Sequence, residues 1–337
     1  MAMVNASLMF ARGLKSNFLA SYKPMLKKSN PMLGELMDLS FESDGAAEDY
    51  PYYLSPPHPT RVDKGDVIPH RAFGARRFRV VNKKWQLSVD WHADDEADDQ
   101  TNGLVAQARA AGEHFALLPE RVFFQILTGT ADTDLLPAIP NAGDGAALFA
   151  TQAAGANRFG ATNGNLLAGQ TLDTPADVRS AIWNAVEQFG EFQDTEGQPL
   201  YPDDYVMRHG IFVLHDNRNQ ELFEEALGQG VTLAVGQNVA GTENVGAAGV
   251  TNTLLSSGMG IRRWATQRIR DNSIYVAIRN PAVKAIFRQV REPLHDNVAD
   301  FANSDRTRES EIKSVYWRER AGYGVCGEPY QIIKITT

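Results

Sequence analysis

The sequence has almost no cysteine, no long apolar run and no secretory signal. Its 337 residues include one cysteine, Cys326, so an internal disulfide framework is excluded and a reducing compartment fits. No stretch approaches the roughly 18 apolar residues that a membrane-spanning helix needs. Charges follow the short apolar part of the N-terminus instead of preceding it, which is not the layout of a signal peptide. We therefore expect synthesis in the cytoplasm and no membrane partner.

Signatures of catalysis and of cofactor binding are also missing. The glycines between residues 236 and 260 form neither a dinucleotide-binding fingerprint nor a P-loop. Two His-Asp dipeptides, at His215 and His295, come without a nucleophile motif, so turn or cap polarity explains them better than a proton relay. Cys326 lies among glycines and is expected to be a buried, inert thiol. The sequence thus predicts a non-enzymatic protein that needs no cofactor and no metal.

The charge is acidic overall and unevenly distributed. A net charge of -8 argues against a protein whose bulk surface grips nucleic acid. Two blocks of opposite sign nearly adjoin, and pairing between them within one chain is the simplest interpretation. The first block has two acids (Asp63 and Asp66) against eight bases: Arg61, Lys64, Arg71, Arg76, Arg77, Arg79, Lys83 and Lys84. The second has no Lys or Arg and six acids: Asp90, Asp94, Asp95, Glu96, Asp98 and Asp99.

Between and after these blocks, an extended stretch runs into a long helix. Trp85, Leu87, Val89 and Trp91 alternate with polar residues, which is typical of a half-buried strand. From about residue 101 to 128, apolar residues at steps of three and four predict one helix face. Pro119 either kinks that helix or begins a second one.

The remaining chain alternates between short elements and glycine-rich loops. Residues 1–34 have the pattern of an amphipathic helix, after which the prolines favour an extended arm. The alternative is a partly disordered terminus. The proline-rich stretch 42–84 ends in a strand over 72–81, and residues 141–170 form loops and short hairpins. Further elements are expected as follows: a helix capped by Thr174, a strand over 211–214, a helix over 219–227, a strand over 274–278, a short helix over 282–290, and a final extended run from Ile312.

Two segments carry a resemblance to a known family. VDWHADDEADDQTNGLVAQARAAGEHFALLPERVFFQIL and RERAGYGVCGEPYQIIKI resemble the strand, spine helix and terminal strands of the Mu-like major head subunit family. Those tailed-phage major capsid proteins have the Hong Kong 97 capsid fold, an α+β architecture. The resemblance implies the following parts: an N-terminal arm (1–45), an extended loop (46–84), a peripheral domain (85–145, spine helix about 101–128), an axial domain (146–289), peripheral return strands (290–329) and a terminal strand to the axial domain (330–337).

The function that the resemblance implies is assembly. Hexamers and pentamers of the chain would build an icosahedral shell around the double-stranded DNA of a tailed bacteriophage, with assembly in the host cytoplasm and the virion as the final location. Portal and scaffold proteins are the expected partners, a decoration protein is a further candidate, and the enclosed DNA would be contacted weakly and non-specifically. The candidate contacts between subunits are Arg61, Lys64, Arg71, Arg76, Arg77, Arg79, Asp94, Asp95, Glu96, Asp98 and Asp99, with basic residues of one copy on acidic residues of the next.

Two other functions remain open at this stage. An encapsulin-like compartment for cargo protein would use the same fold. A metal-dependent hydrolase would use His92 and the acids up to Asp99, since hard divalent cations prefer several carboxylates. Acids ahead of a long helix also have a structural explanation, because they offset the positive end of the helix dipole. Each such acid stabilises the helix by about 0.3 to 1 kcal/mol.

Overall fold

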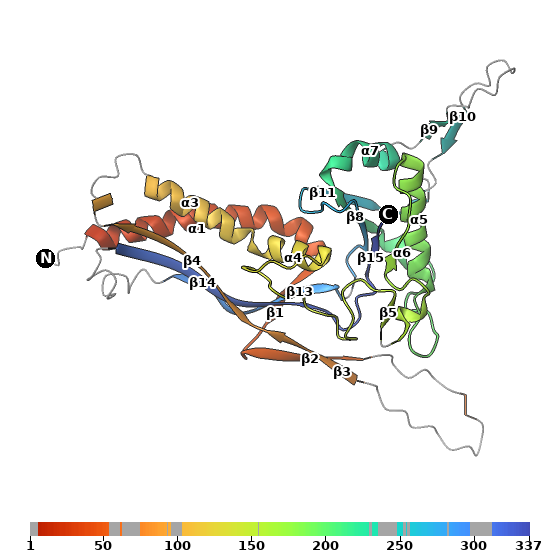
Figure 1. Cartoon of the computed structure of the whole chain (residues 1–337), viewed down its shortest axis with the longest axis horizontal. Coiled ribbons are helices and arrows are strands. Elements are labelled where there is room, and N and C mark those ends of the chain that lie inside the picture. Colours follow the sequence, from red (N-terminus) through yellow and green to blue (C-terminus); the bar gives the residue numbers. More distant parts are fainter. Residues whose placement is uncertain are drawn as a thin grey trace. The chain divides into compact units, whose positions relative to one another are not determined.

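The computed structural model describes most of the chain as two compact units. The described residues are 6–53, 61–62, 75–92, 94–95, 103–153, 155–228, 231–234, 248–251, 254, 257–281, 283–296 and 312–337. Unit 1 comprises Met1–Tyr50, Arg79–Pro140 and Ile286–Gly324, and unit 2 comprises Pro51–Phe78, Asn141–Ala285 and Val325–Thr337. Each unit is therefore assembled from three separate pieces of the chain (Figure 1).

Unit 1 is built on a four-stranded sheet with the order β1-β13-β14-β4. Its strands are β1 (Met37–Glu42), β4 (Lys83–His92), β13 (Ile286–Asp296) and β14 (Ile312–Val325). β1 runs parallel to β13, and β14 runs antiparallel to β4 with Ile312 opposite His92. The predicted alternation of β4 is confirmed, because Trp85, Val89 and Trp91 are buried.

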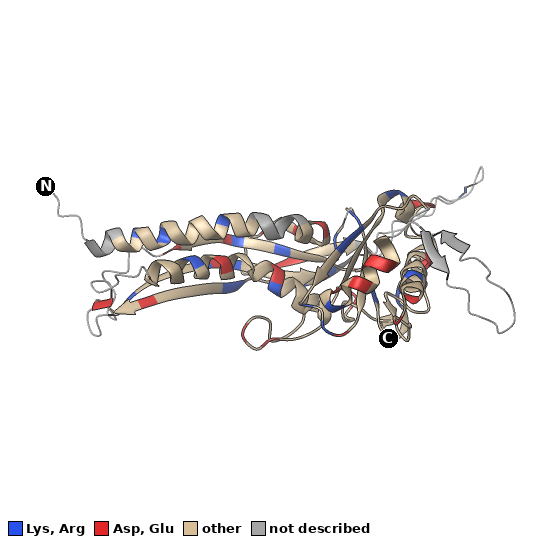
Figure 2. Ribbon diagram, turned by 90° about the horizontal axis from the view of Figure 1, so that it is seen from above, with Lys and Arg blue, Asp and Glu red and all other residues tan. Residues whose placement is uncertain are grey.

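Among the described residues of this unit, three helices are defined: α1 (Ala6–Leu36), α3 (Gly103–Ala116) and α4 (Leu118–Thr128). Figure 2 shows α1 and α3 running side by side along the strands. Phe18 of α1 stacks on Trp317 of β14 with ring centroids 4.1 Å apart, so α1 contributes to the core. The extended arm expected after Pro24 is wrong: the helix continues through that position, because a face anchored by Leu14 and Phe18 offsets the local cost of proline.

The helix expected over about 101–128 is divided into α3 and α4, so of the two alternatives for Pro119 the structure has the second, a new helix. α4 begins anew with Pro119 in its first turn, where the missing N–H of proline leaves no helical bond unmade. Gly129 closes α4 in the left-handed conformation, with φ of 72°.

Beside the four-stranded sheet, β2 (Ala47–Tyr53) pairs with β3 (Ala75–Val81) in a two-stranded sheet. β3 falls within the strand predicted over residues 72–81. The short helix predicted over 282–290 is wrong, because most of that stretch belongs to β13. Pairing with β1 overrides its local helical pattern.

Unit 2 contains a five-stranded sheet with the order β11-β8-β12-β15-β7. These strands are β7 (Leu166–Leu167), β8 (Ile211–Asp216), β11 (Ile261–Thr266), β12 (Ile274–Ile278) and β15 (Ile332–Ile335). β8 and β12 are buried along their whole length, as the predicted apolar runs require.

The described part of unit 2 also contains helices α5 (Pro175–Glu191), α6 (Tyr205–His209) and α7 (Gln220–Gly228), with 3₁₀ turns at Arg158–Gly160 and Asn217–Asn219. The predicted start of α5 is confirmed: the Thr174 hydroxyl accepts the Asp177 N–H, and the Asp177 carboxylate accepts the Thr174 N–H. Small two-stranded sheets pair β5 (Gln152–Ala153) with β6 (Ala156–Asn157), and β9 (Val231–Ala234) with β10 (Ala248–Thr251).

Candidate assembly surfaces

The described basic residues gather on β3 and at the beginning of β4. Arg77 and Arg79 are exposed and alternate with the half-buried Phe78 and the buried Val80, so they share one face of β3 with Val81, which is 48% exposed. Within the described part of the chain, neither arginine forms an ion pair. This face of β3 therefore presents guanidinium groups and an apolar surface that are available to a partner.

The other predicted basic contacts are only partly described. Arg61 is exposed, and Lys83 and Lys84 extend the basic surface onto the first two residues of β4, where both are exposed. Lys64, Arg71 and the side chain of Arg76 lie outside the described residues.

The described acidic residues lie beyond the opposite end of β4. The Asp94 carboxylate approaches His92 Nδ1 at 3.4 Å, and the Asp95 carboxylate accepts the His92 N–H at 3.1 Å. The Asp94 side chain remains 82% exposed. Glu96, Asp98 and Asp99 lie outside the described residues. The described acids therefore cap the end of a strand while their charge faces solvent.

β4 keeps the two sets of charges apart. Nine residue steps separate Lys83 from His92, which is about 30 Å at roughly 3.3 Å per residue. The Debye length at physiological ionic strength is about 8 Å, so charges this far apart at the surface barely interact. Lys83 and Lys84 therefore cannot pair with Asp94 and Asp95 of the same chain, and the chain carries opposite charge at the two ends of one strand.

No cluster that could hold a metal ion occurs among the described residues. Of the residues expected to form such a site, the structure describes His92, Asp94 and Asp95 alone, and the Asp95 carboxylate is already occupied by a backbone N–H. The metal-site hypothesis for 92–99 thus stays a hypothesis.

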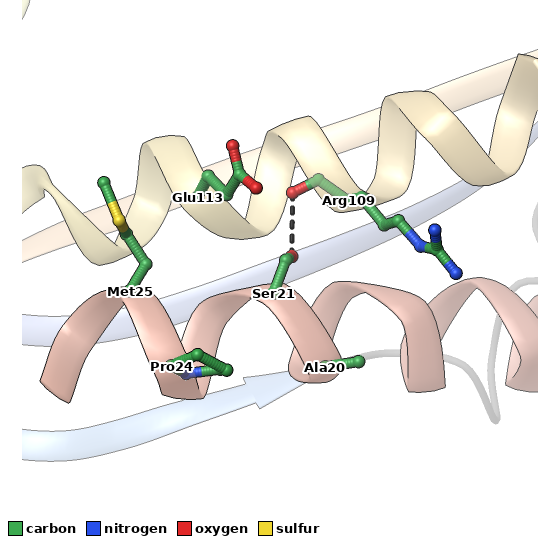
Figure 3. Close-up of a pocket in the computed structure, with 6 residues that line it drawn as sticks. All are labelled: Ala20, Ser21, Pro24, Met25, Arg109 and Glu113. Carbon is green, nitrogen blue, oxygen red and sulfur yellow. Dashed lines mark hydrogen bonds between the residues drawn. The ribbon is translucent and has the colours of Figure 1, made fainter. Parts of the chain in front are cut away.

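A groove of about 410 Å³ lies between α1 and α3, lined by Ala20, Ser21, Pro24, Met25, Arg109 and Glu113 (Figure 3). The Ser21 hydroxyl donates to the Arg109 carbonyl at 2.8 Å, and Arg109 Nε donates to Asn17 Oδ1 at 3.0 Å. A serine engaged in this way, with no histidine in the lining, is not an activated nucleophile. The hydrogen bonds across the groove connect α1 to α3, and its lining residues do not include a nucleophile with a base to activate it.

The His-Asp dipeptides have structural roles. The Asp216 carboxylate accepts the Arg218 N–H at 2.9 Å and so caps the 3₁₀ turn that follows β8, as predicted. His215 stacks on Phe223, with centroids 3.8 Å apart, and burial lowers its pKa. His295 accepts a hydrogen bond from Arg318 Nε.

Cys326 is buried, and burial raises its pKa to about 12. The predicted burial is confirmed, and a thiol with a raised pKa stays protonated at neutral pH, the less reactive form.

Two ion pairs with little exposure to solvent were not predicted from the sequence. Arg288 donates to both carboxylate oxygens of Glu319, at 2.8 and 2.9 Å, in the interior of unit 1. In unit 2, Arg158 donates to both oxygens of Asp144 and to Asn165. The partners lie on different elements or loops of the chain, and no motif in the sequence predicts that they meet.

Comparisons with known proteins give a fold match without a sequence match. No protein-family model matches the chain, and no curated protein matches it. Among described residues, the structure has no helix long and apolar enough to cross a bilayer.

Solved capsid structures match almost the whole chain. The capsid of the cyanophage P-SCSP1u aligns with a TM-score of 0.54 and 12% identity, over 90% of this chain and 87% of that chain. The capsid of the Myoviridae phage XM1 aligns at 0.53 and 12%, over 90% of each chain. The capsid of a native GTA particle aligns at 0.56 and 11%, over 91% and 90%. The chain therefore has the Hong Kong 97-type capsid fold that the resemblance implied.

Proposed function

We propose that this chain is the major capsid protein of a tailed bacteriophage, and that hexamers and pentamers of it build the icosahedral shell around the genome. One observation carries the proposal: the fold matches three capsid chains over nine-tenths of this chain and nearly their whole length. A protein of this kind acts by assembly and not by catalysis, and its location would be the virion after assembly in the host cytoplasm.

The two units support an assignment of domains. Unit 1 holds α3 and α4 with the long strands β4 and β14, and we assign it to the peripheral domain. Unit 2 holds the five-stranded sheet, and we assign it to the axial domain. The β2–β3 pair would be the base of the extended loop.

Opposite charges at the two ends of β4 suit a head-to-tail contact. A ring of identical subunits closes through heterologous contacts, in which one surface of each copy meets a different surface of the next. We propose that the basic face of β3, with Arg77 and Arg79, lies on the acidic residues Asp94 and Asp95 of a neighbour. Rim charges of this kind raise the association rate and set the register more than they raise affinity.

Electron microscopy in negative stain, together with size-exclusion chromatography, tests the assembly itself. Closed or tubular shells of hexamers and pentamers are expected from the purified protein, alone or with its scaffold protein. A discrete small oligomer that persists with scaffold present would refute the proposal.

Charge reversal tests the contact. Arg77→Glu with Arg79→Glu should leave the subunit folded and reduce shell yield, because the like charges then face each other. Adding Asp94→Lys and Asp95→Lys to the same chain restores opposite signs and should restore shells. The matched control is Arg208→Glu with Arg270→Glu, which changes the net charge equally at exposed arginines of unit 2. Normal shells from the first variant would sink the proposed contact without touching the capsid assignment.

The remaining partners belong to the same proposal. Portal and scaffold proteins, a decoration protein and loosely held DNA follow from a capsid role. A cargo compartment is less favoured, because the three capsids compared above belong to phages and a GTA particle. The hydrolase alternative predicts metal content and activity that vanish in Asp94→Asn or Asp95→Asn, whereas a capsid protein assembles in either variant.

A further inference from the structure

The chain leaves the four-stranded sheet of unit 1 and returns to it at two adjacent points. It leaves between β1 and β2, at residues 43–46, and it returns at Asn82, the single residue between β3 and β4. The Ser43 N–H donates to the Val290 carbonyl at 3.0 Å, and the Asn82 N–H donates to the Ala46 carbonyl at 2.9 Å. Backbone hydrogen bonds therefore hold both junctions: residues 43–46 are bonded to β13, and Asn82 is bonded to residues 43–46.

Gln289 of β13 connects the same junctions through its side chain. It is fully buried, and it uses both ends of its amide. Its Oε1 accepts the Tyr50 hydroxyl at 2.7 Å, and its Nε2 donates to Asn82 Oδ1 at 2.9 Å and to the Val80 carbonyl at 3.3 Å. One side chain thus binds β2, β3 and the residue that leads into β4.

Asn82 passes the network on to the other junction. Its Nδ2 donates to Ser43 Oγ at 2.7 Å and to the Gly45 carbonyl at 2.8 Å. The Ser43 hydroxyl then donates to the Glu48 carboxylate at 2.9 Å. The bonds run in one direction from Tyr50 to Glu48, and both of these residues belong to β2, so the network returns to the strand on which it began.

Two observations show that this network fits its site closely. Asn82 and Ser43 are 8% and 5% exposed, so neither water nor a bulky neighbour replaces these bonds easily. A Cβ at Gly322 of β14 would lie 2.9 Å from Gln289 Nε2, so only glycine at that position leaves room for the amide. Buried polar groups that are all satisfied specify one arrangement, because any other arrangement leaves some of them unpaired.

We propose that Gln289 is a positioning residue which, through Asn82, clamps both junctions and fixes the direction in which the β2–β3 pair leaves the sheet. The clamp would set this direction in the free subunit, before any neighbour arrives. Its consequence for shells rests on the proposed function, because the basic face of β3 would reach a neighbour only along that direction. The clamp itself does not depend on that function.

Hydrogen exchange on the unassembled subunit, measured by mass spectrometry, tests the clamp directly. Gln289→Met keeps the length of the side chain and removes every bond of the amide. Tyr50→Phe removes a single hydroxyl and keeps the ring that packs against Phe41 and Phe287. The matched control is Gln331→Met, which removes another buried glutamine, in unit 2.

We expect amide exchange in Ala47–Tyr53 and Ala75–Val81 to become at least about tenfold faster in Gln289→Met, since a buried polar network loses its centre. Tyr50→Phe should give a smaller acceleration in the same peptides, and Gln331→Met none there. Exchange in α4 should stay unchanged in all three, which shows that the subunit remains folded. If Gln289→Met fails to fold, the comparison of Tyr50→Phe with Gln331→Met decides the question alone.

Unchanged exchange in both strands would overturn the clamp, whatever the protein assembles into. Faster exchange with normal shells would confirm the clamp and show that the direction of the β2–β3 pair is not limiting for assembly. Faster exchange with reduced shell yield, and normal yield from Gln331→Met, is the full expected result. If wild-type protein forms no shell even with scaffold, the proposed function fails while the exchange result still judges the clamp.

Discussion

Removing one partner of the buried Arg288–Glu319 pair should destabilise unit 1 far more than removing both. The side chains are 14% and 3% exposed, and both carboxylate oxygens accept bonds from the same guanidinium. Burial lowers the pKa of Arg288, but Tyr323 and Glu319 raise it by more, so the guanidinium stays charged. Either group alone would be a charge in the interior of the unit with nothing opposite it.

The size of the effect follows from that geometry. Arg288→Met or Glu319→Leu alone should each reduce the free energy of unfolding by about 3 to 5 kcal/mol, the usual cost of an uncompensated buried charge. The double variant replaces the pair with apolar side chains of similar bulk and should be close to neutral or more stable than the wild type. The two substitutions are therefore strongly non-additive.

Urea unfolding of the unassembled subunit, followed by circular dichroism, measures the four corners of this cycle. The exposed pair Arg263–Glu224, with side chains 28% and 54% exposed, provides the control. Its coupling energy should lie below about 1 kcal/mol. Additive losses at Arg288 and Glu319 would refute the reasoning, because they would mean that the single variants bury no unpaired charge.

Three further predictions concern stability, and each is read from urea unfolding curves. Gly112→Ala should lower the free energy of unfolding by about 1 to 3 kcal/mol, because a Cβ there would collide with the Phe18 carbonyl of α1; equal stability would show that α1 can shift. Burial lowers the pKa of His215 in the folded chain, so as the pH falls this histidine is protonated in the unfolded chain before it is protonated in the folded chain. Stability should therefore fall as the pH drops below about 6.5, the usual histidine pKa, and the fall should shrink in His215→Phe; an identical pH profile in that variant would contradict this. Thr174→Ala should cost about 1 kcal/mol, since the N-terminus of α5 loses its cap, and a cost near zero would mean that water replaces the hydroxyl.

Elements with a strong local pattern were predictable from the sequence. The alternation around Trp85 gave β4, and Thr174 with the proline after it gave the start of α5. In both cases the residues that decide the element are neighbours in the chain, so the physical cause can be read directly from the sequence.

Elements that depend on distant partners were missed. Residues 286–290 look helical in isolation, yet they form a strand because β1 pairs with them. Glu319 reads as a surface charge within RERAG, but its alternation with Val315, Trp317 and Ala321 directs it into the core, where Arg288 meets it. The helix α1 continues past Pro24 because its face packs on α3 and on Trp317, which lies some 300 residues away in the chain.

The candidate contacts were predictable as blocks of charge but not as surfaces. Alternation along β3 selects Arg77 and Arg79 as exposed neighbours of Val81. The length of β4 then separates this face from Asp94 and Asp95. A charge count cannot show that separation, since the two blocks nearly touch in the sequence.

The order of strands has a consequence for the timing of folding. β1 pairs with β13 across 249 positions, from Met37 to Ile286, and β14 lies inside the sheet of unit 1. β15 likewise lies inside the sheet of unit 2, between β12 and β7. Contacts this distant in sequence close slowly, and neither sheet is complete until residues 312–335 have left the ribosome. A nascent chain therefore cannot present a finished surface to its neighbours, which delays association until synthesis has passed both strands.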